Sequence, residues 1–317
     1  MEPLFLQPVF QEKIWGGTRL HDVFGFELPN DKIGEDWAIS AHPHGVSTVI
    51  NGPFKGENLA DLWQNKKELF GNPTEPVFPL LVKILDAEEE LSVQVHPDDA
   101  YAKEHEGELG KTECWYVIDA QPGAEIIYGH HAKSKAEFAE MVEKTAWDEL
   151  FRRVSVRKGD FFYVPSGTIH AIGKGILILE TQQSSDTTYR VYDYDRVDQA
   201  GNKRELHIQQ SIDVSTIPAV YPTPSIQEAR KDNSTITTYV KTDFFNVYEW
   251  SVKGSLAFKK QAPYTLVTAI SGYGKLLVGD TSYELTPGTS FILPNQINDW
   301  LIEGDVQLIA SEPGRKE

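Results

Sequence analysis

The chain has 317 residues, of which 40% are hydrophobic and 24% charged, a composition that excludes a disordered or collagen-like protein. Lysine and arginine total 30 against 47 aspartates and glutamates, and the resulting net charge of −17 argues against nucleic acid or an anionic membrane as a partner. A single cysteine, Cys114, excludes an internal disulfide framework. No leader peptide and no apolar run long enough to span a bilayer is visible, so we expect a cytoplasmic protein.

Short runs rich in β-branched and aromatic residues, separated by glycine and proline, predict a mostly β protein with a few short helices. Asn58 is a suitable N-cap for a first helix, which would end at Gly71, and 98–105 is predicted as a second short helix. Ser134 begins a capping box, so we expect a helical insertion at about 134–151. The clearest predicted strands are 78–85, 91–95, 114–119, 176–181, 245–252, 275–278 and 305–310.

The proline-containing segment 215–232 is the best candidate for a linker, because prolines break strand pairing and the segment lacks a clear period. It would separate a catalytic domain, residues 1–214, from a second domain, residues 233–317. The second domain contains strand-like runs with predicted turns at 271–272, 279–280 and 287–288, and has the size of a small β-barrel.

Three clusters of polar residues can bring metal ligands together. Gln94 and His96 lie two residues apart, so on a strand they share a face, while Glu113 and His170 belong to later strand-like runs. If these side chains converge inside a barrel, they offer two imidazoles, a carboxylate and an amide oxygen. Such a ligand set suits zinc, iron, manganese or cobalt. The alternative is that each histidine is an ordinary hydrogen-bonded residue, and spacing alone leaves the two readings about even.

The motifs around these residues resemble those of a known superfamily and, more specifically, those of one family within it. Gly159-Asp160, Pro165, Gly167 and His170 match the spacing of the second metal motif of cupins. Within the cupins, the blocks at 15–17, 34–37, 40–43, 94–99, 110–113, 165–171 and 180–190 resemble those of type I phosphomannose isomerases, in the same order. The short chain is similar to the compact bacterial form, and the resemblance implies two cupin-type β-barrel (jelly-roll) domains. The second would be a metal-free cupin-like domain, since no histidine follows its glycine–proline motif at 287–295.

The resemblance also implies roles for individual residues. It implies one Zn²⁺ per chain, with Arg190 as the active-site arginine and Glu180 as a carboxylate proposed for proton transfer. Lys83 and Lys111 match lysines that line the family's sugar-phosphate pocket. The implied zinc ligands are Gln94, His96, Glu113 and His170.

The expected reaction interconverts D-mannose 6-phosphate and D-fructose 6-phosphate by moving a proton between C1 and C2 through an enediol-like intermediate. Glu180 is the preferred base, with a zinc-bound water or a histidine as alternatives, and Lys83, Lys111 and Arg190 would supply the positive charge that a phosphosugar needs in an acidic protein. The alternatives are a non-haem Fe(II) cupin oxygenase, whose ligands are also two histidines and a carboxylate, and a sugar-binding cupin without turnover. We expect a monomer or a weak homodimer.

Overall fold

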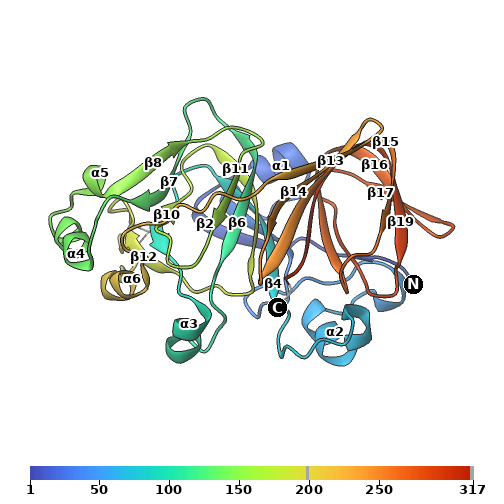
Figure 1. Ribbon diagram of the computed structural model, residues 1–317, viewed down its shortest axis with the longest axis horizontal. Helices are drawn as coiled ribbons and strands as arrows, with labels where there is room; N and C mark the ends of the chain where they lie inside the picture. The colour runs from blue at the N-terminus through green and yellow to red at the C-terminus, as the bar shows by residue number, and fades with distance from the viewer. Residues whose placement is uncertain (198–199, 315–317) are drawn as a thin grey trace.

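The computed structural model of the protein describes residues 1–197 and 200–314, and its described part is dominated by antiparallel β-sheets, as predicted (Figure 1). The N-terminal two-thirds of the chain forms two sheets. In spatial order, the six-stranded sheet contains β2 (Phe10–Gly17), β3 (Ile33–Ile39), β4 (Leu80–Ala87), β11 (Ile176–Gln183), β6 (Glu113–Ala120) and β9 (Phe161–Val164). The five-stranded sheet contains β12 (Tyr189–Tyr192), β5 (Val93–Val95), β10 (His170–Ala171), β7 (Glu125–His130) and β8 (Phe151–Ser155).

The C-terminal part of the chain forms a third, eight-stranded sheet with long strands, which lies at the opposite end of the molecule from α4 and α5 (Figure 1). The N-terminus crosses into it, because Leu4 pairs with Ile292. The strands are β1 (Leu4–Phe5), β18 (Ser290–Leu293), β16 (Thr265–Val278), β19 (Asp299–Pro313), β15 (Phe245–Lys259), β14 (Ser234–Lys241) and β13 (Gln227–Lys231), with β17 (Thr281–Leu285) paired to β16.

Short helices connect the sheets, and the sequence signals locate several of them correctly. The Asn58 side chain accepts the backbone N–H of Asp61 and so caps α2, and Asp98 caps α3 in the same way. The Ser134 hydroxyl caps α4 by accepting the N–H of Glu137. The helices are α1 (Arg19–Phe24), α2 (Leu59–Asn65), α3 (Asp99–His105), α4 (Lys135–Glu143), α5 (Trp147–Leu150) and α6 (Ile208–Val214), with 3₁₀ turns at Gly52–Phe54 and Lys67–Phe70.

One predicted turn is wrong. The sequence at 271–272 predicts a turn because of its glycine, whereas β16 continues through Gly272, just after a β-bulge between Ala269 and Ser271. Gly272 has φ of +75°, and a Cβ there would lie 2.1 Å from the carbonyl oxygen of Asp305, so glycine is needed for close approach of the two strands. The predicted turns at 279–280 and 287–288 are confirmed. The last part of segment 215–232 is a strand, β13.

The two faces of the six-stranded sheet differ, one packing into the core and the other carrying polar residues. On one face, side chains such as Val82 and Cys114 pack into a core shared with the C-terminal sheet. Cys114 is therefore a buried packing residue, and burial raises the pKa of its thiol well above the usual value. The opposite face carries polar residues together with Trp115, and because strand side chains alternate, Lys83 and Glu113 fall on this second face. The functional pocket is built on that face.

Candidate active site

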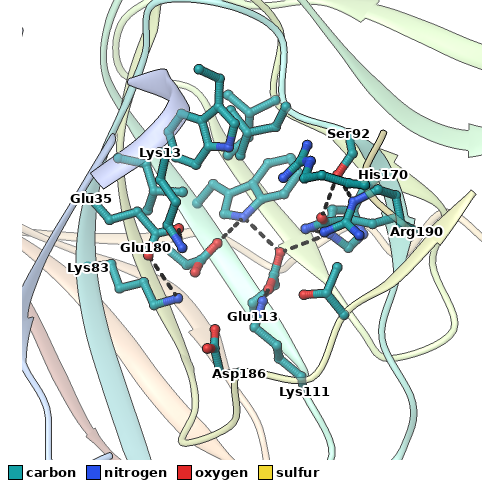
Figure 2. Close-up of a pocket in the computed structure, with 18 residues that line it drawn as sticks. Lys13, Glu35, Lys83, Ser92, Lys111, Glu113, His170, Glu180, Asp186 and Arg190 are labelled. Atoms are coloured by element: carbon teal, nitrogen blue, oxygen red, sulfur yellow. Dashed lines mark hydrogen bonds and ion pairs between the residues drawn. The ribbon is translucent and has the colours of Figure 1, made fainter. Parts of the chain in front are cut away.

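A pocket of about 620 Å³, including its solvent-open mouth, lies against the polar face of the six-stranded sheet. Figure 2 shows Lys83 and Glu35 on one side of the pocket, His170 and Arg190 on the other, and Glu180 and Glu113 between them. Of the predicted site residues, those that line it are Lys83, Gln94, Lys111, Glu113, His170, Glu180 and Arg190.

The remaining predicted residue, His96, lies directly beside this lining and completes a cluster with Glu113 and His170. Their ligand atoms lie within 4.8 Å of one another, and all three side chains are buried. The Nε2 atoms of both histidines are 3.3 Å from the carboxylate of Glu113. This is the one such group of potential metal ligands in the described parts of the chain.

Backbone carbonyls fix both rings of this cluster in the orientation that a metal ligand requires. Nδ1 of His96 is 2.9 Å from the carbonyl oxygen of Thr187, and Nδ1 of His170 is 2.8 Å from that of Thr168. Burial, followed by the charge of Lys111, lowers the pKa of His96 to about 3, and burial also lowers the pKa of His170. Each neutral ring therefore donates from Nδ1 and keeps the Nε2 lone pair directed at the cluster, as metal-binding histidines do.

The Lys111 ammonium shows that this cluster can hold a positive charge. Its Nζ lies 2.8 Å from Oε2 of Glu113 and 2.9 Å from Nε2 of His96, and an ammonium can only donate to both. Burial opposes ionisation of Glu113, but the charge of Lys111 holds its pKa well below the usual value. Two imidazole nitrogens and an ionised carboxylate are a donor set that fits zinc.

Gln94 and Arg190 lie next to the histidine pair because of strand register. On adjacent strands, Gln94 pairs with His170 on one side and with Arg190 on the other. The amide of Gln94 is 3.5 Å from Nε2 of His170. Arg190 donates from Nε to the hydroxyl of Ser92 at 3.2 Å and from Nη1 to the carbonyl of Glu205 at 2.9 Å.

Glu180 occupies the centre of the pocket and is buried. Its Oε2 accepts the indole N–H of Trp115 at 3.0 Å, and the same indole is 3.1 Å from Glu113 (Figure 2). Burial, with repulsion from Glu113 as the next cause, raises the pKa of Glu180 to about 7. A carboxyl group with such a pKa can take and return a proton near neutral pH.

Lys83 is buried beside a carboxylate that the sequence did not identify as its partner. The Nζ of Lys83 is 3.6 Å from Oε2 of Glu35 and 4.6 Å from the centre of the Trp37 ring. Lys13 lies 3.6 Å from the other oxygen of Glu35. A buried ammonium among apolar strand residues is costly without an anionic partner, so the apolar run around Lys83 was the one sequence signal for a carboxylate such as Glu35.

Two further pocket residues were not predicted. Arg204 lies in a segment without a recognisable motif and is held by two hydrogen bonds to the buried Asp193, of 2.8 and 2.6 Å. Asp186 lies within a block that signalled the resemblance but received no role, and it lines the pocket 3.0 Å from Nδ1 of His44. Neither position has a spacing signal, because both side chains reach the pocket from loops.

The site is thus a buried histidine–carboxylate cluster with the donor set of a metal site, in a pocket between two antiparallel sheets. The model of the phosphomannose isomerase type I catalytic domain matches residues 4–118, and that of the mannose-6-phosphate isomerase cupin domain matches residues 235–313. No helix in the described ranges is long and apolar enough to cross a membrane.

Relatives match over nearly the whole chain. Mannose-6-phosphate isomerase of Streptococcus mutans is 58% identical over 312 residues, covering 98% of each chain. The probable mannose-6-phosphate isomerase GmuF of Bacillus subtilis is 52% identical and covers 98% of this chain and 99% of its own. The crystal structure of mannose 6-phosphate isomerase from Bacillus subtilis superposes with a TM-score of 0.97 at 49% identity, covering 98% of this chain and 100% of that one. The chain therefore belongs to the type I mannose-6-phosphate isomerase family.

Proposed function

We propose that the protein interconverts D-mannose 6-phosphate and D-fructose 6-phosphate with one bound zinc ion. The observation that carries this proposal is the cluster of His96, Glu113 and His170, which opens into the same pocket as the carboxyl of Glu180 and the guanidinium of Arg190. Relatives that match nearly the full length of the chain are named for this reaction.

In this proposal, His96, Glu113 and His170 hold the metal, and the amide of Gln94 lies beside His170 as a further ligand. The neutral Nε2 atoms and the ionised carboxylate are already directed at one another. When bound, zinc would supply Lewis-acid polarisation of a substrate oxygen.

Glu180 would act as the base that takes a proton from one carbon and returns it to the neighbouring one. Its pKa of about 7 makes both proton uptake and release accessible near neutral pH. The N–H of Trp115 holds Oε2, which orients the carboxyl group in the pocket. Arg190 would stabilise the negative charge that develops on oxygen, a contribution typically of about 3–4 kcal/mol for a well-placed donor.

The phosphate requires cations that are not already neutralised. Lys111 is paired with Glu113, and Lys83 with Glu35. By contrast, the two bonds of the Arg190 guanidinium go to a hydroxyl and a carbonyl rather than to a carboxylate. Arg190 is therefore the pocket cation that remains available to negative charge on the substrate.

The domain organisation is part of the proposal. We infer a catalytic cupin domain at 1–214 and a second cupin-like domain at 233–317, each a jelly-roll barrel, joined by 215–232. The separate family matches at 4–118 and 235–313 support this division, although β1 pairs with β18 across it.

The test is a coupled assay for fructose 6-phosphate formed from mannose 6-phosphate, run anaerobically with and without chelator. We expect oxygen-independent turnover that chelation abolishes and added zinc restores. Glu180→Gln should bind zinc normally and lose turnover, while Glu284→Gln, an exposed change on β17, should behave as wild type. No turnover by a folded, zinc-loaded sample would refute the isomerase, and turnover that required oxygen would indicate an oxygenase.

A further inference from the structure

The loop 184–188, between β11 and β12, supplies two groups to the candidate active site. The carbonyl of Thr187 accepts from Nδ1 of His96 at 2.9 Å, and the carboxylate of Asp186 lines the pocket. These residues belong to no strand, so sheet pairing does not hold them in place. The position of the Thr187 carbonyl therefore depends on contacts made by side chains.

A single carboxylate, that of Glu108, accepts three hydrogen bonds from this loop. Its Oε2 accepts from the hydroxyl of Ser185 at 3.0 Å, the hydroxyl of Thr187 at 2.9 Å and the backbone N–H of Asp186 at 3.3 Å. Burial opposes its ionisation, but the hydrogen bonds from Thr187, Ser185 and Asp186 hold the pKa of Glu108 below the usual value. Glu108 is therefore an ionised acceptor around which three consecutive residues are arranged.

The other oxygen of Glu108 is held from the opposite side by His42. Nε2 of His42 is 3.3 Å from Oε1 of Glu108, while Nδ1 accepts the backbone N–H of His44. Because Nδ1 is an acceptor, the neutral ring carries its proton on Nε2 and donates it to Glu108. Both oxygens of Glu108 thus accept, and an amide in its place cannot satisfy both sides, because its NH₂ group would face either His42 or the loop.

We propose that Glu108 is a positioning residue for the metal site, which it controls through Thr187 and His96. Its carboxylate fixes Thr187, the carbonyl of Thr187 fixes the Nδ1-protonated form of His96, and that form directs the Nε2 lone pair towards Glu113. The inference rests on the proposed role of His96 as a metal ligand. Glu108 itself does not line the pocket and its side chain is 30% exposed, so removing it opens no cavity in the core.

The test compares Glu108→Gln with the matched control Glu104→Gln, which removes the same charge from an exposed position on α3. Zinc affinity is measured by competition with a chromophoric chelator. Removing outer partners of metal ligands typically weakens binding 10- to 100-fold, and we expect about 10-fold here because the effect passes through Thr187. Cobalt-substituted Glu108→Gln should show an altered visible spectrum, while Glu104→Gln should match the wild type in both measurements.

A second measurement needs no metal. In ¹⁵N-histidine NMR spectra of the metal-free protein, His96 should be protonated at Nδ1, and Glu108→Gln should reduce this form relative to wild type. Thr187→Val removes one hydroxyl from the carboxylate and keeps the backbone carbonyl, so it serves if Glu108→Gln folds poorly. Because both changes act on one chain of contacts, their effects on zinc affinity should be less than additive in the double variant.

The outcomes separate this inference from the proposed function. Wild-type zinc affinity, cobalt spectrum and His96 tautomer in Glu108→Gln would overturn the positioning role and leave the isomerase intact. Additive effects of Glu108→Gln and Thr187→Val would also overturn it, because the two residues would then act separately. If His96→Ala bound zinc as tightly as wild type, the metal role of His96 would be wrong, and both proposals would fail.

Discussion

The buried ion pair between Lys111 and Glu113 makes a quantitative prediction about the metal-free protein. Lys111 is 4% exposed and Glu113 1%, and their charged atoms are 2.8 Å apart. Lys111→Met keeps an unbranched side chain of similar length but leaves the carboxylate without its counter-charge. Burial lowers the pKa of both His96 and His170, which opposes their protonation in place of the lost ammonium.

Removing one partner of a buried pair typically costs about 3–5 kcal/mol, and the near-complete burial of both groups places Lys111→Met in that range. Zinc bound beside Glu113 would supply the missing positive charge, so the cost should largely disappear in the loaded protein. The thermodynamic cycle then requires the variant to bind zinc more tightly than wild type, on the order of 100-fold for 3 kcal/mol.

The assay is urea unfolding of wild type and variant, each with chelator and with saturating zinc. Lys174→Met is the matched control, because its ammonium forms an exposed pair with Glu89 at 2.8 Å. We expect it to leave stability almost unchanged, with no dependence on zinc. If Lys111→Met lost the same stability with and without zinc, or none in the metal-free protein, Lys111 would not be the counter-charge of Glu113.

Three further predictions concern stability, metal binding and turnover. Burial raises the pKa of Asp36 to about 7 from an ordinary 3.8, so its contribution to stability is present below pH 4 and lost as the pH rises towards 7. Asp36→Asn should therefore match wild type in thermal unfolding at pH 4 and be more stable at pH 8, by up to about 4 kcal/mol, and equal stability at pH 8 would contradict this. His170→Ala should lose zinc and activity together, as measured by metal analysis and the coupled assay, and a variant that retained zinc would not fit the cluster. Arg190→Ala should retain zinc while turnover falls about 100-fold or more, and near-full turnover would exclude its role in stabilising charge.

The sequence predicted which residues form the site better than it predicted the side chains and loops that contact them. The resemblance implied that His96, Glu113 and His170 act together, and in the structure the starts of β6 and β10 bring Glu113 and His170 to His96, which directly follows β5. Lys83 and Glu180 are likewise on paired strands, opposite each other in register. For site residues that lie on strands, the alternation of side chains predicts which of them share a face of the sheet.

Residues that reach the site from loops could not be predicted in this way. The positions of Glu108 and Arg204 depend on how loops without a hydrophobic period pack against the sheets. Residue spacing in the sequence does not predict that packing. The C-terminal strands show a related limit. Gly272 reads as a turn in the sequence, but in the structure it allows two long strands to approach closely, which only the tertiary pairing reveals.

The distribution of charge explains how a protein of net charge −17 can accommodate a phosphosugar. Five cationic side chains and four carboxylates line the pocket, so it is less acidic than the chain as a whole. At one end, Lys13 and Lys83 share the carboxylate of Glu35, whereas at the other the guanidinium of Arg190 bonds to a hydroxyl and a backbone carbonyl. Arg190 is therefore the pocket cation that remains available to negative charge on the substrate. Because unphosphorylated mannose lacks the dianion, the same arrangement predicts that it is bound weakly and without a defined orientation.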